Sequence, residues 1–587
     1  MYPPFFFVNK RSLLIGKAHG AKYNSAKLFF NPSCFDSESP PSVTIPTRLV
    51  SIFKQEAVFL PVLLLLGLGL RLFNLDGASL WIDEIYSLMV GNAHLTPERL
   101  DSGIHTADYF YRHYLAWRPL DFHLLIDALK TNVHMPLYYL LLNPWLGMFG
   151  NDAIGLRSFS AVCSTLMLLP LYGLGKALGG KRAGLFCLLV AMLSPFQIYY
   201  GQEGRMYALN LFWSACAALS FWKTLHSPKP FAWSLFYAVS VAGGLLSHYM
   251  FVFFLGFQAL YGLWWLLKFR DFRRLPLLAP AAAVVVLIAW VWAPIYQIQQ
   301  QGVNEEYHFA KGLVGWSRYA TAPVWQPLVT VAGDNRWERV FYLPFTIILF
   351  LLWLLKPGHQ TENRAGKSAT SLIRVEVEGF LLLWILGPLL LQIGYDLVKH
   401  THTSIIDRYA MLISPAMCVW LGLSLNHLQE LQTRKPIQVW ESLLHKLKPA
   451  LLAGLMAILA VCNVWPNSPL RDEHNKDKDI RGKIAYMTQN ARPNDLVFTN
   501  GAWGAALIAA YYLKQNRPGQ PMLYWVSPYR GKLEPLPSPA QLAPYSRAWL
   551  FRYRANNERG LQTAKEYLQS GYPQLRTPMD WFVYSRP

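Results

Sequence analysis

Residues 58–73 read VFLPVLLLLGLGLRLF, and residues 79–87, a few positions further on, read SLWIDEIYS. The first stretch is apolar except for Arg71, which is typical of a transmembrane helix. The acidic pair Asp83 and Glu84 therefore follows the first predicted span almost directly, at the boundary between membrane and water. Carboxylates are costly at that depth and are often functional there. A solvated loop is the simpler interpretation of two acids, so a functional one depends on the segments that follow.

The composition indicates a polytopic membrane protein. Of the 587 residues, 53% are hydrophobic and only 15% are charged, whereas a soluble domain carries about 25% charged residues. The net charge of +20 would suggest nucleic-acid binding in a soluble protein. Here the basic residues gather in short loops between apolar runs, in line with the positive-inside rule, and no nucleic-acid partner is expected. The cysteines form no Cys-x-x-Cys pair, and no disulfide or zinc framework is visible.

About eleven apolar runs are long enough, or nearly so, to cross a lipid bilayer. They cover residues 57–74, 154–178, 182–199, 205–225, 231–248, 249–267, 275–297, 339–356, 377–398, 407–427 and 449–466. Residues 1–50 are polar and basic and are predicted to form a cytoplasmic tail that is poorly ordered. If the chain starts from that tail, every predicted cytoplasmic loop contains a basic cluster. These clusters give the orientation of the predicted membrane domain, which covers residues 51–466.

One further apolar run, from Pro136 to Phe149, is not counted as a span. Counting it as a span would place every later basic loop on the outer side, against the positive-inside rule. At about 14 residues it is also short for a crossing. We therefore expect it to lie along the outer membrane surface as an amphipathic helix. It belongs to a long outer loop, residues 75–153, which also contains the acidic pair. Residues 298–338 are predicted to form a second outer loop.

The composition changes sharply after Pro466. A charged linker at residues 471–479 is followed by strand-like and helical pieces. The strand-like pieces are residues 495–499, 522–526, 548–553 and 581–584, and the helical pieces are residues 503–513 and 560–568. They predict a small extracytoplasmic α/β domain at residues 467–587. We expect this domain to fold separately, to help choose the acceptor and to carry no catalytic group, because it contains none of the motifs described next.

Four segments predicted on the outer side carry candidate functional residues. They are WIDEIYS at 81–87; HMPLYYL at 134–140, running on through Trp145 to LRSFS at 156–160; YYGQEGRMY at 199–207, shortly after Ser194-Pro195-Phe196; and DRY at 407–409, with Pro415. None of these patterns is specific alone. The first three, in this order and spacing, are fairly specific together.

In this order and spacing the segments resemble the polytopic membrane glycosyltransferases of the C-type fold, and among them the protein-mannosyltransferase-like and aminoarabinose-transferase-like families. The family patterns are similar to W-x-D-E, H-P-P-L-Y-Y, Y-S-Q-E-A-R-M-Y and a late R-Y-x(n)-P. The resemblance covers roughly residues 55–425. Met135 stands in place of the first proline of the second pattern, and Gly201 and Gly204 replace the usual Ser and Ala of the third.

The resemblance implies an α-helical membrane protein that moves a sugar from a polyprenyl-phosphate-linked donor to an acceptor hydroxyl on a protein, lipid or polysaccharide. The reaction would take place on the extracytoplasmic face of the plasma (inner) membrane, with the amino terminus of the multi-pass chain in the cytoplasm. A lipid-linked oligosaccharide ligase or polymerase is one alternative. A transporter or flippase is another, but no convincing inverted repeat is visible and the charged candidates gather at the outer ends of spans.

Such a transfer needs chemistry that the motif residues can supply. A base must take the proton of the acceptor hydroxyl, and Asp83 matches the aspartate of the family pattern. Glu84 would hold the acceptor or orient Asp83. The leaving polyprenyl phosphate must be neutralised, and the persistent charge and forked donors of arginine suit Arg205 and Arg408 to that role. Snorkelling at the membrane interface is the alternative for both arginines.

Five further motif residues are candidates for substrate binding: His134, Tyr138, Glu203, Tyr207 and Tyr409. His134 could hydrogen-bond the donor phosphate or the acceptor, although a single interfacial histidine is more often structural. Glu203 could hold substrate or form a local ion pair with Arg205, and the tyrosines could simply pack. No cofactor is expected. The spacing of His400 and His402 is not that of a recognised metal-ligand set, although a divalent metal is not excluded.

Overall fold

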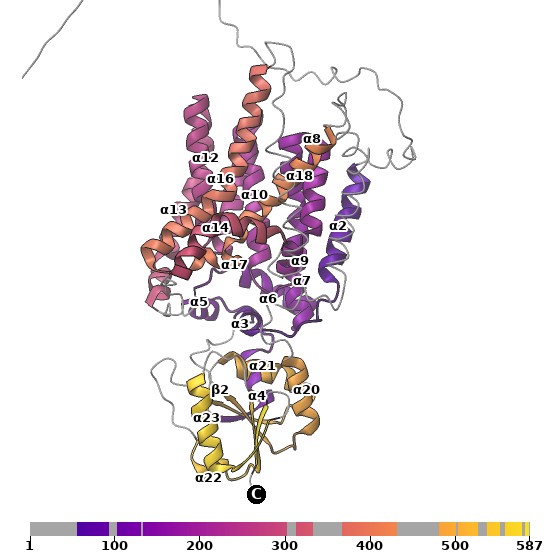
Figure 1. Cartoon of the computed structure of the whole chain (residues 1–587), viewed down its shortest axis with the longest axis vertical. Coiled ribbons are helices and arrows are strands. Elements are labelled where there is room, and N and C mark those ends of the chain that lie inside the picture. The colour runs from indigo at the N-terminus through magenta and orange to yellow at the C-terminus, as the bar shows by residue number, and fades with distance from the viewer. Residues whose placement is uncertain are drawn as a thin grey trace, which may run out of the picture. The chain divides into compact units, whose positions relative to one another are not determined.

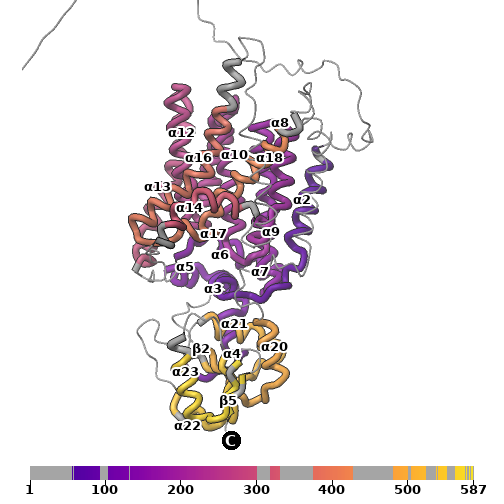
Figure 2. Tube along the Cα trace, in the orientation of Figure 1, coloured from indigo at the N-terminus to yellow at the C-terminus, as the bar shows by residue number. Residues whose placement is uncertain are grey.

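The computed structural model describes residues 56–92, 103–130, 133–301, 313–332, 367–430, 480–500, 503–525, 537–551, 558–577 and 581–585 (Figures 1 and 2). The chain divides into two units, Met1–Phe59 and Leu60–Pro587, and of the first only the start of helix α2 is described. Apart from the first residues of α2, the features discussed below belong to the second unit. The predicted tail at 1–50, the predicted spans at 339–356 and 449–466 and the linker at 471–479 lie outside the described residues.

The membrane part of the second unit is helical. Its long helices are α2 (Glu56–Leu72), α7 (Ala153–Leu166), α8 (Leu168–Leu193), α10 (Tyr207–His226), α11 (Pro230–Ser247), α12 (Phe251–Phe269), α13 (Ala279–Gln301), α14 (Leu313–Ala332), α16 (Lys367–Lys399) and α18 (Ser414–Glu430). The short elements among them are α9 (Pro195–Gly201), η2 (Phe272–Leu278), η4 (Thr403–Ile405), α17 (Asp407–Ala410) and η5 (Met411–Ile413). α8 packs along α18, α10 along α11, and α12 along α16.

Six helical stretches of the described chain are long and apolar enough to cross a membrane: Ala153–Leu193, Pro230–Ser247, Phe251–Phe269, Phe272–Gln300, Val375–Lys399 and Asp407–His427. α2 and α10 also form where the sequence predicts spans. The protein is therefore an α-helical polytopic membrane protein. Two of the roughly eleven predicted spans lie outside the described residues, so the structure tests only part of that number.

Helix α8 consists of two arms that meet at Gly179 and Gly180. The backbone of Gly180 has φ +84° and ψ −179°, a conformation that glycine adopts without the steric cost of a Cβ. The arms pack closely, because a Cβ added at Gly175 would lie 2.6 Å from the Sγ atom of Cys187. The turn falls where the sequence predicts the boundary between the second and third spans.

The outer loop predicted at residues 298–338 contains a helix that the sequence does not predict, α14 (Leu313–Ala332). Pro323 and Pro327 are inside this helix and disguise it in the sequence, since proline removes a backbone donor and crowds the preceding turn. α14 packs against α9, α16 and α18. Neighbouring helices make such proline-containing helices tolerable in membrane proteins.

Arg71, the one charged residue of the first apolar run, is fully buried. Its Nε atom donates to Ser164 Oγ at 2.7 Å. Its terminal nitrogens donate to the carbonyl oxygens of Met192 and Ala191, each at 3.2 Å, in the last turn of α8. A cation suits that position because the last carbonyl groups of a helix lack partners within the helix. Arg71 thus joins α2 to α7 and α8 instead of snorkelling to the surface.

A set of short elements connects the first span to the rest of the membrane part. They are α3 (Ile82–Gly91), β1 (Gly103–Thr106), α4 (Ala107–Tyr114), α5 (Phe122–Lys130) and α6 (Leu137–Phe149). α6 is the apolar run that was predicted to be a surface helix, and its 13 residues confirm a helix too short for a regular crossing. Tyr138, Tyr139 and Leu142 are buried on one side of it, whereas Met148 and Phe149 are exposed.

The C-terminal part forms an α/β domain whose helices flank a sheet (Figure 1). Its elements are α20 (Ile480–Asn490), β2 (Leu496–Asn500), α21 (Trp503–Leu513), β3 (Pro521–Trp525), α22 (Pro539–Leu542), β4 (Arg547–Phe551), α23 (Glu558–Gly571), β5 (Gln574–Arg576) and β6 (Trp581–Ser585). All four predicted strands and both predicted helices are present. β2 runs parallel to its neighbours β3 and β4, and β6 pairs antiparallel with β4 and β5.

The sheet contains one strand that the predicted range 467–587 omits. β1 pairs antiparallel with β3, which gives the strand order β1-β3-β2-β4-β6-β5. The pairing continues beyond the strand, since the N–H groups of Ala107 and Asp108 donate to the carbonyl oxygens of Gln520 and Pro518. The domain is therefore built from two distant parts of the chain, and the expectation that residues 467–587 fold separately is wrong in this respect.

Candidate active site

Asp83 and Glu84 lie in the first turn of α3. Acidic side chains are favoured there because the first N–H groups of a helix have no partners within it. Neighbouring residues of a helix point about 100° apart, so the two carboxylates have different surroundings. Glu84 is 1% exposed, whereas the side chain of Asp83 is 30% exposed. Asp83 is therefore the acid of the pair that a substrate can reach.

Arg157 of α7 holds Glu84. No role for Arg157 is predicted from the sequence. The Nε atom of Arg157 donates to Glu84 Oε1 at 2.7 Å and a terminal nitrogen donates to Oε2 at 2.6 Å. The N–H of Gly204 also donates to Oε1, at 2.8 Å. The other donors of Arg157 bind the carbonyl oxygens of Leu75, Ala78 and Ser79. Glu84 and Arg157 thus link the acidic segment to the glycine-containing third motif.

Arg205 brings three of the motifs together. This buried guanidinium donates from one nitrogen to the carbonyl oxygen of Asp83 at 3.0 Å and to Ser87 Oγ at 3.1 Å. Its other terminal nitrogen lies 3.2 Å from His134 Nε2. Since arginine can only donate, His134 Nε2 accepts and its proton resides on Nδ1. The first, second and third motifs therefore meet at one side chain.

The histidines of the site are neutral. Burial, together with Arg205, His248 and Arg408, holds the pKa of His134 well below its ordinary value. His248, in the turn between α11 and α12, was not assigned a role from the sequence because no motif surrounds it. Its ring centre lies 6.1 Å from that of Tyr207 and 6.2 Å from that of Tyr409. Burial and the same two arginines lower the pKa of His248 to about 3.

Arg408 adds the fourth motif to the site. A terminal nitrogen of its guanidinium lies 3.6 Å from Asp83 Oδ2, and the Arg408 side chain is 28% exposed. The guanidinium also lies 5.3 Å from the ring centre of Tyr409. The backbone around Arg408 is broken into the short α17 and the 3-10 turn η5 before α18 begins. Asp83 and Arg408 thus form a partly exposed pair beside the buried Arg205.

Glu203, in the turn between α9 and α10, is buried and does not form the ion pair with Arg205 that was weighed as an alternative. Its Oε2 atom and the Nε atom of Arg205 have no hydrogen-bond partner among the described residues. Burial and the nearby Glu84 raise the pKa of Glu203 to about 8, despite the opposing effect of Arg205 and Arg408. Glu203 is therefore protonated at neutral pH and can donate as well as accept.

We expect the Glu203→Gln variant to lose a pH dependence of stability. The folded chain binds the Glu203 proton more tightly than the unfolded chain, whose pKa is near the ordinary 4.5. The resulting stabilisation is full below pH 4.5 and is lost as the pH rises through about 8. Each pKa unit corresponds to about 1.4 kcal/mol, so the loss across this window should reach a few kcal/mol. Thermal unfolding of both chains between pH 5 and 9 measures it, and parallel curves would contradict it.

The candidate tyrosines are in contact with the site. Tyr138 is buried, with its ring centre 5.2 Å from that of Tyr139 and 5.6 Å from that of Phe159. The Tyr207 ring lies 6.0 Å from the Arg205 guanidinium. Tyr138 packs against these rings, and Tyr207 and Tyr409 line the part of the site that contains the two arginines; substrate binding by all three tyrosines stays a prediction.

The turn with His400 and His402 is organised by Asp396 of α16. The fully buried carboxylate of Asp396 accepts from the N–H groups of Thr403 and Ser404 at 2.9 and 2.7 Å. It also accepts from the hydroxyl groups of Thr401 and Thr403. Asp396 is thus engaged in shaping the turn. Within the described ranges, no three His, Cys, Asp or Glu residues are grouped to hold a metal ion.

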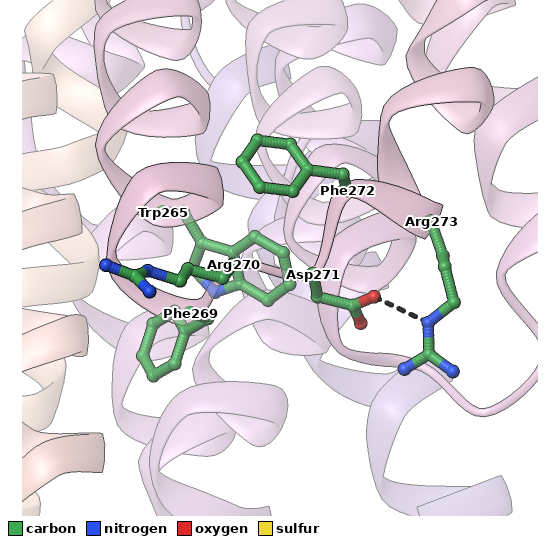
Figure 3. Close-up of a pocket in the computed structure, with 6 residues that line it drawn as sticks. All are labelled: Trp265, Phe269, Arg270, Asp271, Phe272 and Arg273. Carbon is green, nitrogen blue, oxygen red and sulfur yellow. Dashed lines mark hydrogen bonds and ion pairs between the residues drawn. The ribbon is translucent and has the colours of Figure 1, made fainter.

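An open pocket of about 730 Å³ lies away from this site, at the end of α12. Its lining residues are Trp265, Phe269, Arg270, Asp271, Phe272 and Arg273 (Figure 3). The 19 residues of α12 separate it from His248 by about 28 Å at 1.5 Å per residue. Figure 3 shows the guanidinium groups of Arg270 and Arg273 on opposite sides of the pocket, so they do not converge on one ligand position.

The fold and part of the sequence match known proteins. Residues 133–294 match the family model described as "Dolichyl-phosphate-mannose-protein mannosyltransferase". The crystal structure of ArnT from Cupriavidus metallidurans in the apo state is similar, with a TM-score of 0.53, 12% identity and coverage of 92% of this chain and 98% of that chain. The same ArnT bound to undecaprenyl phosphate gives a TM-score of 0.50, 14% identity and the same coverages, 92% and 98%. A comparison with curated protein sequences gives no match.

The family match spans the second and third motifs, His134 to Tyr207, and continues to α13. The similarity to ArnT extends over nearly the whole of both chains. At this level of identity it establishes the fold. The chain is therefore a polytopic membrane protein with the C-type glycosyltransferase fold, and its residues 133–294 match the family model named above.

Proposed function

We propose that this protein transfers a sugar from a polyprenyl-phosphate-linked donor to an acceptor hydroxyl. The observation that carries the proposal is the meeting of four motifs at one site, where the reachable carboxylate of Asp83 lies beside Arg408 and the buried Arg205 binds the Asp83 carbonyl oxygen. A base next to two cations is what an acceptor alcohol and a departing phosphate require together.

In the proposed reaction Asp83 takes the proton of the acceptor hydroxyl. The hydroxyl oxygen forms a new bond to the anomeric carbon of the sugar while the bond from that carbon to the phosphate oxygen breaks. The electron pair of the broken bond remains on the polyprenyl phosphate, whose added negative charge Arg408 and Arg205 stabilise. Undecaprenyl phosphate bound to the similar ArnT supports a donor of this class.

Two buried atoms of the site fit a polar substrate. Glu203 Oε2 and Arg205 Nε have no protein partner among the described residues. A buried polar group without a partner costs about 1–3 kcal/mol, and a ligand hydroxyl or phosphate oxygen would remove that cost. We propose that Glu203, His134, Tyr207 and Tyr409 contact the donor, and that Glu84 orients the segment of Asp83 through Arg157 and does not touch substrate.

The direct test uses purified protein and radiolabelled polyprenyl-phosphate monosaccharides. Release of polyprenyl phosphate that depends on the protein and on Asp83 is the expected result. Activity only with donors carrying a longer glycan would favour a ligase or polymerase. Movement of intact donor across vesicles without release of polyprenyl phosphate would overturn the proposal in favour of a transporter.

Replacing both arginines with alanine should weaken binding of the donor. Loss of a hydrogen bond between charged groups costs about 1.5–3 kcal/mol, or one to two decades in affinity per residue. Both arginines also contact Asp83, Arg205 at the backbone carbonyl oxygen and Arg408 at the carboxylate, so the readout is donor binding and not turnover. Arg408→Lys should recover only part of the affinity, since an ammonium lacks the forked donors.

Equilibrium binding of a polyprenyl phosphate to each variant measures this effect. Arg112→Ala is the matched control, because that side chain is 72% exposed and, among the described residues, its ion-pair partner is Asp108 on α4. Unchanged binding in the Arg205→Ala, Arg408→Ala chain would assign both arginines a structural role.

We further propose that the site and the C-terminal domain are extracytoplasmic and that the amino terminus is cytoplasmic. The basic clusters of the predicted inner loops support this orientation. Four cysteines are buried, so single exposed cysteines can be introduced after Cys34 and Cys462 are replaced with serine. A membrane-impermeant maleimide should label Asp127→Cys from outside the cell and Lys181→Cys only after permeabilisation. The opposite pattern would invert the orientation.

A further inference from the structure

The segment that presents Asp83 is held from two sides. On one side, Arg157 of the membrane part binds the carbonyl oxygens of Leu75, Ala78 and Ser79, as described above. On the other side, the C-terminal domain binds the N–H and side-chain groups of the same segment. Residues 75–80 lack regular secondary structure, so these contacts substitute for the hydrogen bonds that a helix or sheet would supply.

Tyr512 and Arg481 make the contacts from the C-terminal domain. The N–H of Leu80 donates to the hydroxyl oxygen of Tyr512 at 2.8 Å, between residues 432 positions apart in the chain. A terminal nitrogen of Arg481 donates to the carbonyl oxygen of Asp76 at 2.9 Å and to Asp76 Oδ1 at 2.8 Å. The N–H of Arg481 donates to Ser79 Oγ at 3.1 Å.

The segment that presents Asp83 also packs closely against α21. A Cβ added at Gly504 would lie 2.2 Å from Cγ1 of Ile82, the residue next to Asp83. The hydroxyl oxygen of Tyr511, next to Tyr512, accepts from the N–H of Ala153 at 3.0 Å, at the start of the helix that carries Arg157. Helix α21 therefore contacts both the segment that carries Asp83 and the helix α7, which carries Arg157.

We propose that the C-terminal domain is a structural part of the active site, with Tyr512 and Arg481 acting as positioning residues that set the location of Asp83. The inference rests on the proposed function, in which Asp83 is the base, and it adds a positioning role to the sequence-based expectation of a domain that helps choose the acceptor and carries no catalytic group. A base must lie within hydrogen-bond reach of the proton it takes, so a small displacement of this segment slows the proton transfer.

The test compares three single variants of the full-length chain. Tyr512→Phe removes the acceptor of the Leu80 N–H and keeps the ring. Gly504→Ala forces α21 and Ile82 apart. Tyr567→Phe is the matched control, since it removes a hydroxyl group that bonds to the carbonyl oxygen of Pro537 in the same domain but away from the Asp83 segment.

For Tyr512→Phe we expect kcat to fall about 3–10-fold, the equivalent of one hydrogen bond, with a larger fall for Gly504→Ala. Affinity for polyprenyl phosphate should stay within twofold of the unaltered chain, because the arginines are not moved directly. If losing a hydroxyl group merely destabilises the domain, Tyr567→Phe should also lower the amount of folded protein. If the contacts position Asp83, kcat per folded molecule should fall only in Tyr512→Phe and Gly504→Ala.

Hydrogen exchange of the peptide covering residues 75–87 gives a readout that does not need activity. Tyr512→Phe should accelerate exchange there, and Tyr567→Phe should not. Unchanged exchange would overturn the contact itself, and faster exchange with unaltered kcat would overturn its role in positioning Asp83. Absence of transfer by the unaltered chain, with the exchange result as expected, would instead overturn the proposed function.

Discussion

Replacing Asp83 with asparagine is expected to abolish nearly all sugar transfer while leaving the chain folded and inserted. The side chain is partly exposed, and its one ion-pair partner among the described residues is Arg408 at 3.6 Å, so the change removes little packing. General-base catalysis contributes roughly 10²–10⁴-fold to a rate. The loss should be at least as large, because asparagine has the shape of the carboxylate but does not take a proton.

The measurement is turnover per folded molecule, after monodispersity and thermal unfolding have been matched to the unaltered chain. Asp127→Asn is the control, because it makes the same chemical change at an exposed surface pair with Lys130. Transfer by Asp83→Asn within a few-fold of the unaltered chain would remove Asp83 from the role of base.

Breaking the pair between Glu84 and Arg157 is expected to have the largest effect on stability. The two side chains are 1% and 5% exposed, and each end of the pair makes further hydrogen bonds. Glu84→Gln would leave the guanidinium charge buried without its counter-charge, which typically costs about 3–5 kcal/mol. Arg157→Ala should cost more, because it also releases the three backbone carbonyl groups between Leu75 and Ser79.

Thermal unfolding in detergent or nanodiscs measures this cost. The matched control is Asp108→Asn, which breaks the exposed pair with Arg112 on α4 and should cost less than about 1 kcal/mol. If Glu84→Gln unfolds at the same temperature as the control and retains transfer, the pair does not hold the acidic segment. The structural role that we assign to Glu84 would then be wrong.

The sequence predicts the parts of this fold that depend on local composition. Apolar runs locate the helices α10 to α13, and the glycine pair at Gly179 and Gly180 separates two spans. The motifs predict that Asp83, His134, Arg205 and Arg408 share a site, and the structure brings these four side chains together. The roles proposed for them stay predictions until they are tested by substitution.

The remaining features depend on contacts between distant residues. Asp83 and Glu84 are adjacent in the sequence, and it is the contacts of Glu84 with the distant Arg157 and Gly204 that bury it in an ion pair. The helix α14 is hidden by its own prolines. The pairing of β1 with β3 leaves no local signal, because a four-residue strand inside a long loop resembles many unstructured segments.

The pairing of β1 with β3 also bears on how the protein is made. Gly103 pairs with Tyr524, several hundred positions later, so β1 leaves the ribosome long before its partner exists. A domain completes its folding as its parts leave the ribosome. Contacts between residues this far apart in the sequence therefore form late. A bilayer-inserted chain that ends early would keep most of its helices and lack the contacts that support the segment carrying Asp83. Premature termination should therefore yield an inert product, and sugar transfer would begin only after translation of the chain is finished.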